Sequence, residues 1–332
     1  MSTHETPQAK RTVKLGATGP EVFALGLGCM GMSGVYGATD DAESLRTLHA
    51  AIERGVTLID TGDFYGMGHN EMLVGRALEG RRDKVQLSVK FGALRGPDGS
   101  FGGMDMRPAA VKNFVAYSLK RLGVEVIDIY RPARLDPAVP IEDTIGAIAD
   151  LVKAGYVRHI GLSEVGAETI RRAHKVHPIV DLQIEYSIAS RGPEEHIFPV
   201  LRELGISATL YGVFSRGLLT GSKPGTGDGR AHLPRFAGAN GAKNEDSVKA
   251  LQDFARERQL TPAQLTLAWV LARQPGFVPV VGTKTRAQLE DSLGALRRPL
   301  SEADARALES LVTISGDRYV AEQMKHLDSE RR

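Results

Sequence analysis

Short apolar runs alternate with amphipathic stretches along almost the whole of this sequence. The runs that we expect to be strands are rich in valine, isoleucine and leucine and cover 23–28, 56–60, 85–90, 126–130, 157–163, 180–186, 206–211 and 278–282. Alanine and leucine recur at helical spacing between them, which predicts helices at 41–54, 70–80, 108–122, 142–154, 166–175, 193–204, 262–273 and 285–296. About eight β-α units in 332 residues fit the number and size of a closed (β/α)8 barrel, an α/β fold. An open doubly wound sheet is the alternative.

Other features indicate one barrel domain at 12–318, with an N-terminal hairpin and extra C-terminal helices. A Gly-Pro turn joins two short runs near the N-terminus, which predicts a β-hairpin that could plug the bottom of the barrel. No linker rich in proline or serine divides the chain. The longest irregular stretch, 221–244, has the length of a lid or cofactor-covering loop, with a disordered insertion as the alternative. The terminal tails are 1–11 and 319–332, and we expect 1–10 and 325–332 to be mobile.

The composition argues against several classes of function. Lysine and arginine number 42 against 40 acidic residues, so the net charge of +2 gives no strong attraction to nucleic acid or to an anionic membrane. No apolar stretch approaches the ~20 residues of a membrane span, and the polar N-terminus lacks a signal core. Cys29 is the only cysteine, and the nine histidines show no metal-ligand spacing. We therefore expect a cytoplasmic protein without a metal site.

Asp60, Tyr65 and Lys90 carry the strongest chemical signal. They lie in DTGDFYG (60–66) and LSVKFG (87–92), at the ends of two predicted strands, where barrels build their active sites. A tyrosine hydroxyl titrates near ~10 in water, and a nearby lysine cation lowers that pKa, so the phenol could protonate a developing alkoxide near neutral pH. Asp60 would pair with Lys90 and hold it in place. An ordinary surface turn beside an unrelated lysine is the alternative.

A glycine motif after the first predicted strand suggests a dinucleotide fold. Gly26, Gly28 and Gly31 match GxGxxG. In a Rossmann unit such glycines open directly into a helix that holds the pyrophosphate. Here they run into another loop, and the helix begins only near Asp41. A glycine-rich first loop that lets the backbone approach a ligand is the better interpretation.

Taken in order, the motifs resemble the aldo-keto reductase family, over roughly 12–315. The matching stretches are LGLGCMGMSG (25–34), DTGDFYG (60–66), NEMLVGRAL (70–78), SVKFG (88–92), LDPAVPIEDT (135–144), GLSEVGAETIRRA (161–173), QIEYS (183–187), YGVFSRGLLTG (211–221), LPRF (233–236) and VPVVGTK (278–284). The resemblance implies a (β/α)8 barrel that binds NADPH or NADP⁺ in an extended pose and reversibly reduces an aldehyde or ketone to the alcohol. It implies that Tyr65 is the general acid, that Lys90 lowers its pKa and that Asp60 supports Lys90.

The resemblance also implies cofactor contacts. Ser163 and Gln183 match groups that bind the nicotinamide carboxamide, and Tyr211 matches the aromatic that stacks beneath the ring. Further contacts near the nicotinamide are implied for Asp60, Cys29, Met30 and Gly31. The loop over the pyrophosphate corresponds to Arg216, Gly217 and Leu218. The 2′-phosphate and adenine region corresponds to Gly282, Thr283, Lys284, Gln288, Asp291 and Ser292. A lysine beside a phosphate favours NADPH over NADH.

Three positions depart from the family pattern. Aligned on Asp136-Pro137, Ala133 stands where the family has a catalytic histidine, and it can neither donate a hydrogen bond nor orient a carbonyl. We expect either slow turnover of simple aldehydes or a bulky or xenobiotic ketone that is held mainly by apolar contacts and by Tyr65. Glu164 and Ser292 stand where asparagine is common, and an ionised glutamate cannot donate to the carboxamide.

Two other functions stay open from the sequence alone. One is a weakly active NADPH-binding regulatory subunit, like the potassium-channel β-subunits that share the barrel. The other is a Rossmann dehydrogenase of hydroxy acids. The expected partner is a small aldehyde or ketone, and the expected oligomeric state is a monomer or a weak homo-oligomer.

Overall fold

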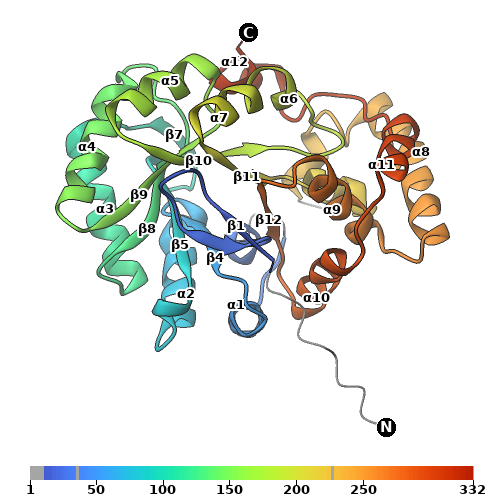
Figure 1. The fold of residues 1–332 in the computed structure, drawn as a ribbon, viewed down its shortest axis with the longest axis horizontal. Helices are drawn as coiled ribbons and strands as arrows, with labels where there is room; N and C mark the ends of the chain where they lie inside the picture. Colours follow the sequence, from blue (N-terminus) through green and yellow to red (C-terminus); the bar gives the residue numbers. More distant parts are fainter. Residues whose placement is uncertain (1–10, 35–36, 226–227, 332) are drawn as a thin grey trace.

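A computed structural model describes residues 11–34, 37–225 and 228–331 and shows a closed barrel of eight parallel strands (Figure 1). The barrel strands are β3 (Gly26–Gly28), β4 (Leu58–Gly62), β5 (Gln86–Phe91), β8 (Ile127–Pro132), β9 (Val157–Ser163), β10 (Ile179–Glu185), β11 (Ser207–Tyr211) and β12 (Val278–Gly282). They neighbour one another in the order β10-β11-β12-β3-β4-β5-β8-β9. The predicted (β/α)8 barrel is confirmed, and the open doubly wound sheet and the Rossmann dehydrogenase built on it are wrong.

Helices surround these strands close to the predicted positions (Figure 1). They are α1 (Asp41–Glu53), α2 (His69–Leu78), α3 (Pro108–Leu122), α4 (Ile141–Lys153), α5 (Ala167–Val176), α6 (Pro193–His196), α7 (Phe198–Leu204), α9 (Pro262–Arg273) and α10 (Arg286–Gly294). The helix expected at 193–204 is split at Ile197, because Pro199 lacks a backbone N–H and falls in the first turn of a new helix. Short 3-10 turns complete the connections: η1 (Met30–Ser33), η2 (Tyr65–Gly68), η3 (Arg82–Lys84), η4 (Ser215–Thr220) and η6 (Ala295–Arg297).

The N-terminal hairpin closes one end of the barrel, as predicted. Strands β1 (Thr12–Lys14) and β2 (Glu21–Phe23) pair antiparallel. Leu15 and Val22 from this hairpin lie in a buried cluster with residues from the strands, namely Leu58, Ile129, Val180, Val278 and Val280. That end is therefore filled with apolar side chains, which leaves the opposite, C-terminal end for a site.

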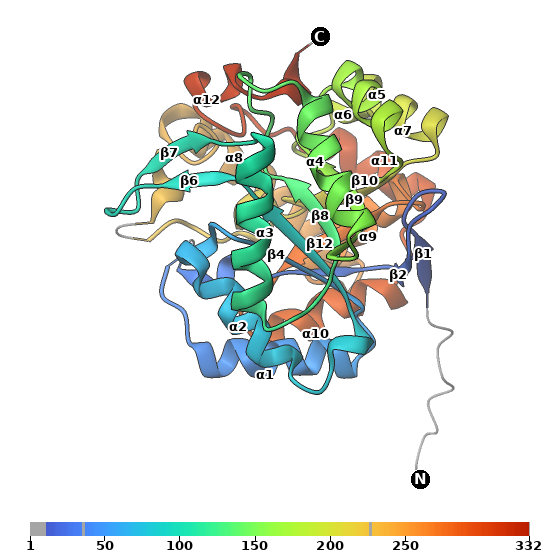
Figure 2. The same ribbon diagram turned by 90° about the vertical axis from the view of Figure 1, so that its left-hand side faces the viewer.

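A second hairpin, which the sequence did not reveal, projects on the other side of the barrel (Figure 2). It consists of β6 (Ala93–Arg95) and β7 (Phe101–Met104), paired antiparallel just after β5. Gly102 and Gly103 interrupt β7, and glycine carries no side chain to create a period-two pattern.

The irregular stretch expected at 221–244 is shorter than predicted. It contains η5 (Gly229–His232), and α8 (Gly238–Glu257) begins within it. The first turns of α8 contain Gly238 and Gly241, which are poor helix formers and hid the start of the helix. No helix in the described ranges is long and apolar enough to cross a membrane.

The expected C-terminal helices are present as α11 (Glu302–Leu311) and α12 (Ala321–Lys325), followed by the 3-10 turn η7 (Asp328–Glu330). In the end from 325 onward, which we expect to be mobile, the structure shows the turn η7 and a contact with the barrel. Asp328 accepts a hydrogen bond from the Gly166 backbone N–H at 2.8 Å, which fastens this end to the barrel. The predictions for 1–10 and for 332 lie outside the described residues.

Candidate active site

Asp60, Tyr65 and Lys90 meet at the C-terminal end of the barrel. Strands β4 and β5 are neighbours, with Gly62 opposite Lys90, and the Lys90 Nζ lies 2.5 Å from the Asp60 Oδ1. The same Nζ lies 5.2 Å from the centre of the Tyr65 ring. Asp60, Tyr65 and Lys90 therefore form one buried cluster, although Asp60 and Lys90 are 30 residues apart in sequence.

The turn that carries Tyr65 depends on a left-handed backbone. Gly66 has a φ of +56°, and a Cβ at this position would lie 2.9 Å from the Ser33 Cβ. Glycine is therefore required there both by conformation and by space. This close approach fixes the turn that carries Tyr65 against the first β-α loop.

Three donors converge on the Asp60 carboxylate. Besides Lys90, the Ser88 Oγ donates to Oδ2 at 2.8 Å and the Gln183 Nε2 donates to the same oxygen at 2.9 Å. Burial lowers the pKa of Lys90 below its ordinary value, and the adjacent Asp60 carboxylate acts in the opposite direction. Asp60 is thus the group that favours the charged form of the buried lysine.

Beneath this cluster lies a second buried ion pair. Arg131 is fully buried, and its guanidinium donates to the Asp181 Oδ2 at 2.9 Å and to the Ser88 Oγ at 3.0 Å. Ser88 therefore connects the two pairs. Arg131 is occupied in the floor of the site and is not a substitute for the missing histidine.

Ala133 and Arg134 occupy the position where the family pattern breaks. Ala133 is only 1% exposed, so a substrate would contact it only after neighbouring side chains move. Arg134 is half-buried, and its Nη1 lies 2.6 Å from the Ala133 carbonyl oxygen and 3.4 Å from the Ser163 Oγ. Among the described residues, no carboxylate forms an ion pair with Arg134. Arg134 therefore places a positive charge beside Ser163.

The predicted nicotinamide end has the donor and acceptor that a carboxamide needs. The Ser163 Oγ only accepts a bond, from Arg134, so within the described chain its hydroxyl proton has no acceptor. Gln183 donates through its Nε2, and no described donor reaches its Oε1. A carboxamide oxygen could accept from Ser163 and its NH₂ could donate to Gln183, so these residues fit a nicotinamide.

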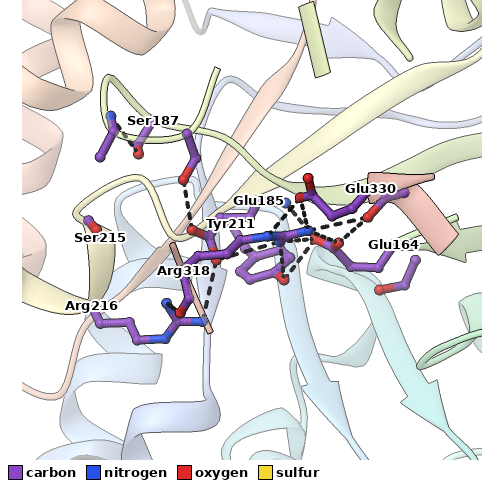
Figure 3. Close-up of polar contacts among 12 residues, drawn as sticks. Glu164, Glu185, Ser187, Tyr211, Ser215, Arg216, Arg318 and Glu330 are labelled. Carbon is purple, nitrogen blue, oxygen red and sulfur yellow. Dashed lines mark hydrogen bonds and ion pairs between the residues drawn. The ribbon is translucent and has the colours of Figure 1, made fainter. Parts of the chain in front are cut away.

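Glu164 is committed to other partners (Figure 3). Its carboxylate accepts the Tyr211 hydroxyl at 2.8 Å and the Arg318 guanidinium at 2.8 and 2.5 Å. Burial raises the pKa of Glu164, but the attraction of Arg318 outweighs it and leaves the pKa below its usual range. The ionised Glu164 is therefore not available to the carboxamide in this arrangement.

The first loop approaches the site with its backbone. The Cys29 side chain is fully buried in the core, and its backbone carbonyl accepts the Asn70 Nδ2 at 2.8 Å. Burial raises the pKa of the Cys29 thiol far above its ordinary value, with Asp60 adding to the effect. Of the three predicted contacts here, Cys29 and Gly31 are buried, whereas Met30 is partly exposed.

The loop predicted to cover the pyrophosphate is η4. Arg216 and Gly217 have φ values of +56° and +90°, so the loop turns through left-handed backbone at both positions. The Arg230 Nη1 donates to the Arg216 carbonyl oxygen at 2.7 Å, and Leu218 packs inward. The predicted contact residues therefore lie on a tightly held turn after β11.

The residues predicted for the adenine end differ in their hydrogen-bond partners. The buried Thr283 Oγ1 has no described hydrogen-bond partner, and the Gln288 Oε1 accepts the Lys284 backbone N–H at 2.8 Å. Asp291 instead accepts the side chains of Thr261 and Gln264, which form the capping box of α9. The remaining predicted positions are Gly282, exposed at the end of β12, and Ser292, whose Oγ donates to the Gln288 carbonyl.

Sequence reasoning missed three residues near the site. Arg286 begins α10 beside Lys284 and pairs with Glu43 at 3.2 Å. Arg318 and Tyr319 come from the segment between α11 and α12. No periodic pattern marks these residues, and the only local signal in the segment was an arginine beside an aromatic residue.

Asp63 is a buried carboxyl beside the catalytic turn. Its Oδ2 accepts the Gly92 backbone N–H at 3.2 Å, while its Oδ1 has no partner among the described residues. Burial raises the pKa of Asp63 to about 7 from 3.8, with the Gly92 bond acting in the opposite direction and nearby Glu71 adding to the rise. The folded protein therefore holds a proton here that the unfolded chain has lost above about pH 4.

We expect Asp63→Asn to remove one pH-dependent contribution to stability. Between pH 3.8 and about 7 the folded state binds more protons at Asp63 than the unfolded state, so the free energy of unfolding falls as the pH rises through this window. The neutral amide should flatten that fall, by ~3 kcal/mol between about pH 5 and about pH 7 at ~1.4 kcal/mol per pKa unit. Urea unfolding from about pH 5 to about pH 8 measures it, with the exposed Asp83→Asn as control. Parallel curves for the wild type and Asp63→Asn would contradict the assignment.

Comparison with known proteins places these features in context. A model of the aldo/keto reductase family matches residues 24–313. The chain is 43% identical over 319 residues to "Probable aldo-keto reductase 1" of Glycine max, covering 92% of this chain and 91% of that protein. A glycerol dehydrogenase structure from Gluconobacter oxydans covers 98% of both chains with a TM-score of 0.83 at 25% identity. The holo form of an aldo-keto reductase from Bacillus halodurans matches with a TM-score of 0.75 at 28% identity, over 93% of this chain and 98% of that one.

Proposed function

The chain belongs to the aldo/keto reductase family and is therefore an NAD(P)-dependent oxidoreductase that reduces a carbonyl group; within that activity, we propose that it uses NADPH, donates the proton from Tyr65 and favours a bulky ketone. The observation that carries the proton donor is the buried cluster in which the Lys90 Nζ contacts Asp60 and lies 5.2 Å from the Tyr65 ring. A nicotinamide supplies the hydride when it is bound.

The chain's own residues act on the proton. Asp60 favours the charged form of Lys90, and the lysine cation favours the ionised form of the Tyr65 phenol. The phenol then gives its proton to the substrate oxygen as negative charge develops there. In the reverse direction the same phenolate accepts the proton from an alcohol.

Apolar side chains at the mouth support a bulky substrate. Met67, in the catalytic turn, is 56% exposed, and Phe101, on the β6–β7 hairpin, is 61% exposed. The Arg95 guanidinium lies 6.0 Å from the Phe64 ring centre, which places the hairpin beside the turn. A fused-ring ketone could cover this apolar rim while its oxygen reaches Tyr65.

Restoring histidine at 133 tests the substrate preference. Because a positioned donor is worth about 10²–10³ in turnover in other enzymes, we expect Ala133→His to raise turnover of small aldehydes and to lower kcat/KM for polycyclic ketones. Ala133→Leu is the matched control, since it adds bulk without a donor and should impair only the bulky substrates. A histidine variant that handles bulky ketones better than the wild type would rule out the steric explanation.

Lys284 tests the cofactor preference. A charged hydrogen bond to phosphate is worth ~1.5–3 kcal/mol, so we expect Lys284→Met to raise the KM for NADPH about 10- to 100-fold while the KM for NADH stays unchanged. Steady-state kinetics with both cofactors measure this. Lys112→Met on α3, whose amine pairs with Asp150 at 3.2 Å, is the control. Equal losses with NADPH and NADH would remove the support for a 2′-phosphate contact.

A screen of NADPH oxidation tests the function as a whole. The panel holds small aldehydes, quinones and polycyclic ketones, with Tyr65→Phe as the blank. We expect the wild type to turn over polycyclic ketones and the Tyr65→Phe blank not to do so. Wild-type protein that binds NADPH but reduces no member of the panel would instead favour a regulatory role.

A further inference from the structure

Arg318 connects the C-terminal segment to the barrel by a bidentate ion pair with Glu164 (Figure 3), and its Nη1 also lies 3.7 Å from the Glu185 Oε2. Its side chain is 5% exposed, and its Nη1 and Nη2 lie 2.8 and 2.5 Å from the two carboxylate oxygens of Glu164. Its Nη2 also lies 2.8 Å from the Glu330 Oε1. Two parallel bonds to one carboxylate fix a guanidinium in direction as well as in distance.

The same carboxylate holds the Tyr211 ring. The Tyr211 hydroxyl donates to the Glu164 Oε1 at 2.8 Å, the oxygen that also accepts from Arg318. The Arg318 Nη1 also lies 3.5 Å from the Tyr211 hydroxyl itself. The Ser329 Oγ donates to the other oxygen at 2.7 Å. Glu164 thus transmits the position of the C-terminal segment to the end of β11.

The backbone geometry of Glu164 indicates that its surroundings hold it in this position. Glu164 has a φ of +54°, a conformation that costs a residue with a side chain some free energy and persists only where the surroundings impose it. Its carboxylate also accepts the backbone N–H of Glu185 at 2.8 Å. The strained residue directly follows Ser163, at the predicted nicotinamide end.

The C-terminal segment also contacts the η4 loop. The Arg216 Nη1 donates to the Arg318 carbonyl oxygen at 3.1 Å, and the Arg216 guanidinium lies 4.5 Å from the Tyr319 ring centre. Adjacent residues of one segment therefore touch both the loop predicted over the pyrophosphate and the ring predicted beneath the nicotinamide.

We propose that Arg318 is a positioning residue for the nicotinamide end of the cofactor site, acting on the Tyr211 hydroxyl through Glu164 and through its own contact at 3.5 Å. This inference rests on the proposed function, in which Tyr211 stacks beneath the ring. Without Arg318, the Glu164 carboxylate keeps its bonds to Ser329 and to the Glu185 N–H but loses the two charged bonds that fix its direction toward Tyr211. The C-terminal segment is then a structural part of the cofactor site.

The test compares binding of the whole cofactor with binding of the fragment that lacks the nicotinamide. We expect Arg318→Lys, and the charge-neutral double variant Glu164→Gln/Arg318→Met, to weaken NADPH binding about tenfold or more and to lower kcat. Binding of 2′,5′-ADP, which carries the adenine end alone, should stay within about twofold. Equal losses for NADPH and 2′,5′-ADP, or no loss for either, would overturn the inference.

A double-mutant cycle with Tyr211→Phe tests the route of the effect. If Arg318 acts through the hydroxyl of Tyr211, its substitution should change NADPH binding much less in the Tyr211→Phe background than in the wild type. Additive effects would overturn the inference. Glu164→Gln alone is the second variant if the Arg318 variants do not fold, since it keeps the size of the side chain, and it too should separate NADPH from 2′,5′-ADP.

Two controls separate the inference from the proposed function. Arg331→Met removes an exposed guanidinium of the same segment, 3.7 Å from Asp328, and should leave both affinities unchanged. If the wild type binds NADPH and the Arg318 variants bind it equally well, the inference is overturned and the proposed function is not. Wild-type protein that binds neither NADPH nor 2′,5′-ADP would overturn the proposed function and the inference together.

Discussion

Tyr65→Phe should lower turnover of every carbonyl substrate by about 10²–10⁴-fold, the usual contribution of a general acid, while NADPH still binds. The substitution removes only the hydroxyl, and the ring keeps its edge-to-face packing on Phe64, with centres 4.8 Å apart. The turn should therefore keep its shape, and the loss should appear in kcat. Single-turnover oxidation of NADPH, together with NADPH affinity, separates the chemical step from binding.

Tyr117→Phe is the matched control for this prediction. Tyr117 is an exposed tyrosine on α3, away from the turn, so losing its hydroxyl should leave both quantities unchanged. A Tyr65→Phe protein that retains more than about a tenth of the wild-type kcat would indicate another proton donor.

The sequence predicted the barrel and the catalytic cluster because both depend on local patterns. Parallel barrel strands are buried on both faces, so they appear as short continuous apolar runs between helices. Asp60 and Lys90 lie at the ends of consecutive strands, and consecutive parallel strands in a barrel are neighbours. Their meeting could therefore be inferred without any long-range contact.

The parts that the sequence did not reveal depend on distant contacts or weak local signals. Arg318 lies 154 residues from Glu164, and nothing in either neighbourhood predicts their ion pair. The start of α8 is hidden by Gly238, and β7 by its paired glycines. The departure at Glu164 was visible as an unusual residue, but its commitment to Arg318 and Tyr211 required the structure.

Lys90→Met should lower turnover near neutral pH by about 10²-fold or more, because the phenol becomes a weaker acid without the cation. It should also move the basic limb of the pH–rate profile to higher pH. That limb reports loss of the phenolic proton, and removing a cation lets the phenol keep its proton to a higher pH. A profile whose basic limb stays in place would show that Lys90 does not tune Tyr65.

Loss of stability has to be separated from loss of chemistry in this variant. Removing Lys90 leaves the buried Asp60 carboxylate with the Ser88 hydroxyl and the Gln183 amide but no cation, and breaking a buried pair costs ~3–5 kcal/mol. The double variant Asp60→Asn/Lys90→Met removes both charges, so urea unfolding should show stability recovered toward the wild type. Turnover should stay low, because the neutral pair still supplies no cation to the phenol. If turnover recovered together with stability, the lysine would serve the fold and not the proton transfer, since packing is the only contribution that the neutral pair can restore.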